Sequence, residues 1–196
     1  ASMLSKLRSD VNKLKRGVET KTFFETVGAN SIPLIGAQFP VGYPYSIVQG
    51  LTDSTRIGTK VILKGYNLLL NVLASSPGTM DSFVVLDRQC NGAAAAATDI
   101  WQGTGDLMSS NSLNPDNLGR FKILSHKRTV ISSTAPYKTV QHKLTRLDIP
   151  IQYDNNGTPA VGDLTQNNIL VFTQCEASSA IVLNATGSCT LTYTDQ

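Results

Sequence analysis

The sequence predicts an all-β fold of about eight strands in a two-sheet sandwich or barrel, preceded by one short amphipathic N-terminal α-helix. Short runs of alternating polar and apolar residues recur along the chain, turn residues separate them, and only two short segments have a helical pattern. The chain has 196 residues, of which 41% are hydrophobic and 16% charged, which is typical of one folded domain with a sizeable core.

Turn residues divide the body into its expected elements. Turns are predicted at 75–78, 91–92 and 154–157, where Ser, Pro, Asn, Asp and Gly cluster. The proline-rich segment 28–49 is expected to be an ordered loop or an edge segment, and the alanine-rich segment 93–101 a helix. The chain is expected to become extended at Phe23-Phe24, and the further strands are predicted at Arg56–Ala74, Ser82–Asp87, Arg120–Ser133, Tyr137–Pro150, Asn168–Gln174, Ala180–Leu183 and Cys189–Thr194.

The positive charge is concentrated at the N-terminus. Residues 1–21 carry six basic and two acidic side chains, a surplus of +4, whereas the remaining 175 residues hold 11 basic and 12 acidic ones. This imbalance divides the chain into a basic arm, residues 1–22, and a single β domain, residues 23–196. It also predicts a polyanionic partner such as nucleic acid. The residues expected to bind its phosphates are Lys6, Arg8, Lys13, Lys15, Arg16 and Lys21.

The arm also has an apolar face. Leu4, Leu7, Val11, Leu14 and Val18 recur at spacings of 3, 4, 3 and 4, which is the seam of a helical coil. This face could dock on the arm's own domain, or it could bundle with the arms of neighbouring subunits through Leu4, Leu7, Val11 and Leu14. A helix lying on a membrane surface is a third alternative. Bundling would leave the basic residues pointing outward at phosphates.

Several function classes lack support in the sequence. No apolar run reaches the roughly 20 residues of a membrane span, and the basic N-terminus does not have the pattern of a secretory signal. Cys90, Cys175 and Cys189 have no zinc-ligand spacing; free thiols are favoured, although Cys175 and Cys189 could face one another. The two histidines, His126 and His142, are interpreted as exposed or interface residues, and no nucleophile or phosphate-loop motif is present, so no enzymatic activity is predicted.

Several segments, in order, resemble the coat proteins of the satellite tobacco necrosis virus family and related single-domain capsids of small circular single-stranded DNA viruses. They follow the basic amphipathic N-terminus and are SIVQG (46–50), FVVLDRQCNG (83–92), NPDNLGRFKILSHKRTVIS (114–132), LDIPIQYDNNGTP (147–159) and YTDQ (193–196). The stretch 114–132 is the most specific of them.

This resemblance implies an eight-stranded jelly roll that assembles, inside the host cell, into the smallest icosahedral shell of a virion, with roughly sixty copies. It implies N-terminal helices that bundle inside the shell and contact single-stranded nucleic acid. The family also binds calcium between subunits, and its C-terminal acidic ligand corresponds to Asp195. The other ligand positions here are Ile57 and Lys60, which offer no side-chain oxygen, so neither a metal site nor any other cofactor is predicted. A lysine could replace the cation with an ion pair.

Two questions stay open at this level. A second basic set on the predicted strands could line a shell interior, pair with acids of a neighbour, or be a solvated face; it comprises Lys122, Lys127, Arg128, Lys138, Lys143 and Arg146. The rival to a capsid protein is a secreted or cellular jelly-roll binding module of the lectin or cytokine type, which would have no reason for a basic amphipathic arm.

Overall fold

The structure of the chain is a computed structural model. It describes residues 3–7, 19–32, 36–74, 77–103, 107–154, 160–176 and 183–196.

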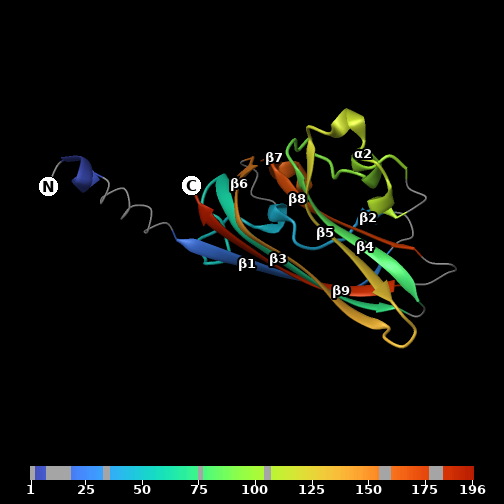
Figure 1. The fold of residues 1–196 in the computed structure, drawn as a ribbon. Coiled ribbons are helices and arrows are strands. Elements are labelled where there is room, and N and C mark those ends of the chain that lie inside the picture. The colour runs from blue at the N-terminus through green and yellow to red at the C-terminus, as the bar shows by residue number, and fades with distance from the viewer. Residues whose placement is uncertain are drawn as a thin grey trace.

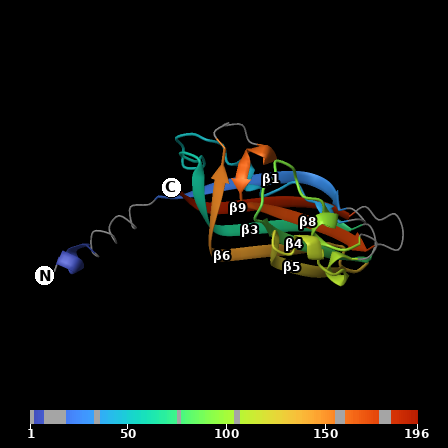
Figure 2. The same cartoon turned by 90° about the horizontal axis from the view of Figure 1, so that it is seen from above.

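Two antiparallel sheets face one another (Figures 1 and 2). The five-stranded sheet has the order β1 (Thr20–Ile32), β9 (Leu183–Asp195), β3 (Lys60–Ala74), β6 (Tyr137–Tyr153), β7 (Leu164–Gln166). The four-stranded sheet has the order β2 (Ala37–Gln38), β8 (Asn168–Glu176), β4 (Gly78–Asp87), β5 (Phe121–Ile131). The short helical turns are η1 (Pro44–Ser46), α2 (Ala97–Ile100), η2 (Met108–Ser110), η3 (Pro115–Asn117) and η4 (Val161–Asp163).

The pairing of the strands establishes a jelly roll. The first four strands pair in reverse order with later ones: β1 with β9, β2 with β8, β3 with β6 and β4 with β5. Such a long paired ribbon, rolled so that alternate pairs fall into opposite sheets, is the jelly-roll topology. The predicted eight-stranded jelly roll is therefore confirmed, and β7 adds a short ninth strand beside β6.

The core lies between the sheets. On β3 the inward positions Leu63, Tyr66, Leu68, Leu70 and Val72 are fully buried, while the residues between them are partly or fully exposed. This is the alternation expected of a strand with one covered face.

The central strands of the four-stranded sheet, β4 and β8, are buried on both faces. Inward residues of β4 such as Val84 join the main core, whereas Phe83 and Val85 point to the other side and pack with Trp101. Trp101 belongs to the segment 88–120, whose described residues, 88–103 and 107–120, include α2 and cover the outer face of β4 and β8 (Figure 1). Because both faces are covered, β4 has nearly continuous burial rather than alternation.

Some element boundaries differ from those predicted. The helix expected over 93–101 is the single turn α2. It begins after Ala96, whose N–H donates to the Asp99 carboxylate 2.8 Å away, and it ends at Ile100 because the backbone of Trp101 is extended. The two strands predicted at Ala180–Leu183 and Cys189–Thr194 correspond to one strand, β9, with residues 180–182 outside the described part. β1 begins at Thr20 and continues to Ile32, through the start of the segment expected to be loop.

Candidate nucleic-acid and assembly surfaces

The N-terminal residues 3–7 are helical and present apolar side chains to solvent. Met3, Leu4 and Leu7 are 85%, 69% and 62% exposed, so this helical turn does not pack its apolar face on its own domain. Lys6 lies on the same turn and is exposed. The remaining predicted seam residues, Val11 and Leu14, lie outside the described residues, as do the predicted phosphate contacts Arg8, Lys13, Lys15 and Arg16.

Lys21 is placed differently from what the sequence indicated. It lies on β1 with its side chain turned inward, only 3% exposed. Its ammonium pairs with the Asp195 carboxylate at 2.9 Å and donates to the Thr55 carbonyl at the same distance. The strand alternation dictates this orientation, because Thr20 and Thr22 on either side point outward. Lys21 is therefore not placed to contact phosphates, contrary to the expectation from the sequence: its charge holds the start of β1 to the end of β9.

Asp195 has both oxygens engaged within the chain. One carboxylate oxygen accepts from Lys21 and the other accepts from the backbone N–H of Ile57 at 3.1 Å. The cation beside this carboxylate is thus the lysine of β1, not Lys60, the lysine at one of the family's ligand positions. Within the described ranges, no group of three or more His, Cys, Asp or Glu side chains could hold a metal ion.

The second basic set is divided between different environments. Arg128 on β5 lies against the buried Asp81 carboxylate, with its Nε 3.1 Å away, and also hydrogen-bonds Ser109. Lys143 on β6 points to the outer face of the five-stranded sheet, where none of the described residues forms an ion pair or hydrogen bond with it. Lys122 is exposed on β5, the edge strand of the other sheet. The fold therefore does not gather the six residues into one cluster.

His142 is a core residue, which corrects its interpretation as an exposed or interface histidine. Its ring is fully buried between the sheets, with Nε2 2.9 Å from Ser82 Oγ and Nδ1 2.8 Å from Ser125 Oγ. Burial, together with the nearby positive charges of Lys127 and His126, lowers the pKa of His142 to about 4. The imidazole is thus neutral near pH 7. Its second nitrogen faces a hydroxyl instead of a carboxylate, and burial leaves no room for a substrate, so the Ser82–His142 pair lacks the geometry of a catalytic triad.

Asp81 fixes the cover of the four-stranded sheet. Its carboxylate is fully buried and accepts from His126, Arg128 and the backbone N–H of Ser109. Burial by itself would raise the pKa of this carboxyl, but the hydrogen bonds from Arg128, Ser109 and His126 outweigh it and lower the pKa. Because Ser109 belongs to the covering segment, this ionised group joins that segment to β4 and β5.

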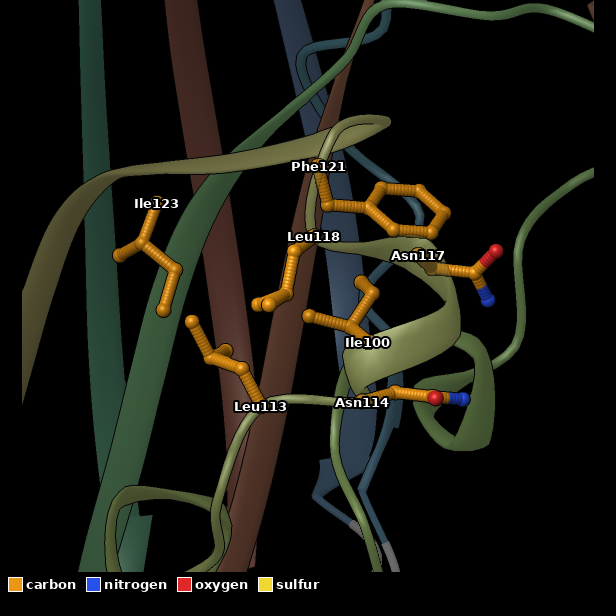
Figure 3. Close-up of a pocket in the computed structure, with 7 residues that line it drawn as sticks. All are labelled: Ile100, Leu113, Asn114, Asn117, Leu118, Phe121 and Ile123. Carbon is orange, nitrogen blue, oxygen red and sulfur yellow. The ribbon is translucent and has the colours of Figure 1, made fainter.

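The cover also forms a small apolar hollow (Figure 3). Ile100, Leu113 and Leu118 of the covering segment converge there on Phe121 and Ile123 of β5, with Asn114 and Asn117 at the rim. Both asparagine side chains already form hydrogen bonds within the covering segment: Asn114 caps η3, and Asn117 donates to the Asp99 carbonyl. The hollow has no charged lining residue and carries no chemistry.

The three cysteines are free thiols, with Cys175 and Cys189 buried on opposite sheets and therefore unable to face one another as paired strand neighbours. No helix among the described residues is long and apolar enough to cross a membrane.

No protein-family model matches the chain, and no curated protein matches it. Solved structures do. A Desmodium yellow mottle tymovirus structure has 10% identity over 91% of this chain and 88% of that chain, with a TM-score of 0.37. A turnip yellow mosaic virus structure has 12% identity over 91% and 94%, with a TM-score of 0.38. A semi-empty virus-like particle of the nodavirus of the giant freshwater prawn Macrobrachium rosenbergii has 9% identity over 90% and 84%, with a TM-score of 0.31.

These structural neighbours are virus capsid proteins. TM-scores below 0.5 are too low to assign the chain to any of their families. The jelly roll is established by the strand order of this chain itself.

Proposed function

We propose that this protein is the coat protein of a small virus, whose subunits assemble into an icosahedral shell of roughly sixty copies. Its N-terminal arm faces the interior and binds single-stranded nucleic acid. The protein acts through assembly and binding, without an enzymatic activity of its own.

The observation that carries this proposal is the exposed apolar face of the N-terminal helical turn. Leu4 and Leu7 have the spacing of a helical seam, yet neither packs against the chain's own domain. An isolated helix of two heptads is marginal in water, so this face calls for a partner. Equivalent arms of neighbouring subunits are the partner that the pattern fits, because shell assembly holds them together at a high effective concentration.

The charge distribution supports the same proposal. The arm carries a surplus of +4, while the rest of the chain has a net charge of −1. The Lys21–Asp195 ion pair attaches the arm's last residues to the sheet, so the arm is held at a defined point where β1 begins at Thr20. A lectin-like or cytokine-like module has no use for such an arm.

The experiment separates the two faces of the arm. The double variant Leu7→Asp, Val11→Asp is expected to reduce or abolish particles in negative-stain microscopy and size-exclusion chromatography. The triple variant Lys13→Ala, Lys15→Ala, Arg16→Ala is expected to form shells with less nucleic acid, measured by the ratio of absorbance at 260 and 280 nm. Identical behaviour of the two variants would contradict the two-face arm, and a wild-type monomer or trimer that binds sugar would favour the binding module.

A further inference from the structure

No described segment covers the outer face of the five-stranded sheet, which is rich in hydroxyl and amide side chains. Successive rows cross four strands at right angles to them. One row joins Thr22, Thr192, Gly65 and Thr145, and the next joins Phe24, Thr190, Asn67 and Lys143. Apart from Lys143, none of the residues in these two rows is charged.

A hollow lies on these two rows. It measures about 210 Å³ and is lined by Lys143, Asn67 and three threonines, Thr145, Thr190 and Thr192. Gly65 also lines it; this residue has no side chain to fill the hollow and follows a register shift of β3 against both β6 and β9. A water molecule occupies roughly 30 Å³ in the liquid, so the hollow has room for a larger polar group.

The lining is a set of hydrogen-bond donors suited to an anion. The Lys143 ammonium has no ion pair among the described residues, and no described side chain occupies the three threonine hydroxyls. The Oδ1 of Asn67 already accepts from Gln141 Nε2 at 2.7 Å, which leaves its NH₂ group as the free end. An ammonium, hydroxyls and an amide NH₂ without an opposing carboxylate complement a phosphate.

An exposed aromatic side chain lies on the same row. Phe24 is 61% exposed on β1 and is three strands from Lys143, or about 14 Å at the usual spacing of strands. Single-stranded nucleic acids bind sheet faces that combine aromatic platforms for the bases with cations for the backbone. The basic arm joins the sheet at Thr20, beside the first of these rows, so one nucleic-acid strand can contact the arm and this face together.

We propose that this hollow binds a phosphate of single-stranded nucleic acid, with a neighbouring base stacked on Phe24. The inference rests on the proposed function and adds a second contact surface to it: the outer face of the five-stranded sheet would line the shell interior. Lys143 supplies the charge, the threonines and Asn67 orient the phosphate oxygens, and Phe24 distinguishes a nucleic-acid strand from a free phosphate ion.

The test uses the unassembled 196-residue chain and a labelled oligothymidylate of roughly 20 nucleotides, which is long enough to cover the hollow and Phe24 together. Affinity is measured by fluorescence anisotropy over a series of salt concentrations. Lys143→Ala is expected to flatten the plot of log K against log salt by about 0.7, the value for one lost single-strand phosphate contact. Lys122→Ala, which removes an exposed lysine from the other sheet, is the matched control and leaves the slope within error of the wild type.

Two further variants separate stacking and shape from charge. Phe24→Ala is expected to weaken binding about fivefold or more at every salt concentration without changing the slope, because stacking contributes no counterion release. Val130→Ala, at another exposed apolar side chain, is its control.

Gly65→Gln fills the hollow without changing the charge and should flatten the salt plot as Lys143→Ala does. Gly65→Ala is sterically tolerated, since an added Cβ meets nothing closer than 3.5 Å.

Unchanged slopes for both Lys143→Ala and Gly65→Gln would overturn the proposal. A Lys143→Ala chain that binds the oligonucleotide normally but no longer forms particles would assign Lys143 to a carboxylate of a second copy. Weakened binding of inorganic phosphate by Lys143→Ala, with no effect of Phe24→Ala on the oligonucleotide, would indicate a site for a free anion. Particle formation by the wild type is scored separately, so a chain that forms no shells yet shows the Lys143-dependent slope overturns the proposed function alone.

Discussion

The two sheets of the sandwich use the same inner core but differ on their outer faces. The four-stranded sheet is covered by the described parts of the segment 88–120, through an apolar cluster in which Phe83 and Phe172 pack around Trp101 and through the buried Asp81 carboxylate. No part of the chain that the structure describes lies over the five-stranded sheet, and its outward residues are mainly threonine, serine, asparagine and glutamine. The outer residues of each sheet thus match what lies over it: the four-stranded sheet is covered by another part of the same chain, and no described part of the chain covers the five-stranded sheet.

The largest expected effect comes from removing the anchor of the cover. Trp101 is fully buried, with its ring centroid 4.9 Å from Phe83 and 5.4 Å from Phe172. Trp101→Ala should lower the free energy of unfolding by about 3–5 kcal/mol, through lost burial and the cavity left behind. The control on the uncovered sheet is Thr26→Ala, with a change within about 0.5 kcal/mol. Equal losses in urea denaturation would contradict the difference between the two faces.

A second prediction concerns the polar contact between the sheets. His142 of the five-stranded sheet bonds Ser82 and Ser125 of the other sheet and has its pKa lowered to about 4 by burial and by Lys127 and His126. The unfolded chain, with a histidine pKa near 6.5, binds this proton more readily than the folded one. The stabilising contribution is therefore complete above about pH 6.5 and is lost as the pH falls toward 4, by roughly 2–3 kcal/mol.

Denaturation curves between pH 7 and pH 4 test this window. The variant His142→Gln should be less stable at pH 7 but should show a flatter pH dependence over the same range. Asp81 titrates at lower pH than His142, because its pKa in the folded chain is lowered. Its stabilising contribution therefore persists between pH 7 and pH 4, and it is lost only as the pH falls through the folded pKa of Asp81. An unchanged pH profile in His142→Gln would show that His142 is not the titrating group.

The third prediction compares lysines on the two faces of the five-stranded sheet. Lys21→Ala removes the inward ammonium and leaves the largely buried Asp195 carboxylate with only the Ile57 N–H, which should cost about 2 kcal/mol. Lys64→Ala breaks the exposed Lys64–Asp148 pair and should cost less than about 1 kcal/mol. If the two variants have equal stability in urea, the pair at the start of β1 does not hold the arm to the sheet.

The smallest expected effect lies on the uncovered face itself. Gln141→Ala removes the hydrogen bond to Asn67 Oδ1, but both groups are accessible to water, so stability should change by less than about 0.5 kcal/mol. A larger loss in thermal unfolding would indicate that the polar rows stabilise the domain, and would weaken the view that this face serves an external partner.

Local pattern predicted much of the fold and little of the site. The alternation on β3 and the turn residues after it correctly predicted strands. A strand with one covered face alternates apolar and polar residues, and this pattern is visible within a few positions of the sequence. Local pattern fails for Lys21 and His142: Lys21 looks solvent-exposed because it ends the basic arm, and His142 because Lys143 follows it. Only partners distant in sequence reveal that both side chains are buried. Lys21 needs Asp195, 174 residues away, and His142 needs Ser82, 60 residues away.

By itself, the sequence determined the fold class, the division into a basic arm and a β domain, and the amphipathic spacing of Leu4 and Leu7. These follow from composition and short-range periodicity, which act within a few residues. Only the tertiary structure decided which face of each sheet is covered, that β9 is one continuous strand, and that Lys143 shares a hollow with threonines from another strand. Those properties depend on strand register and on which sheet each strand joins, and long-range pairing sets both.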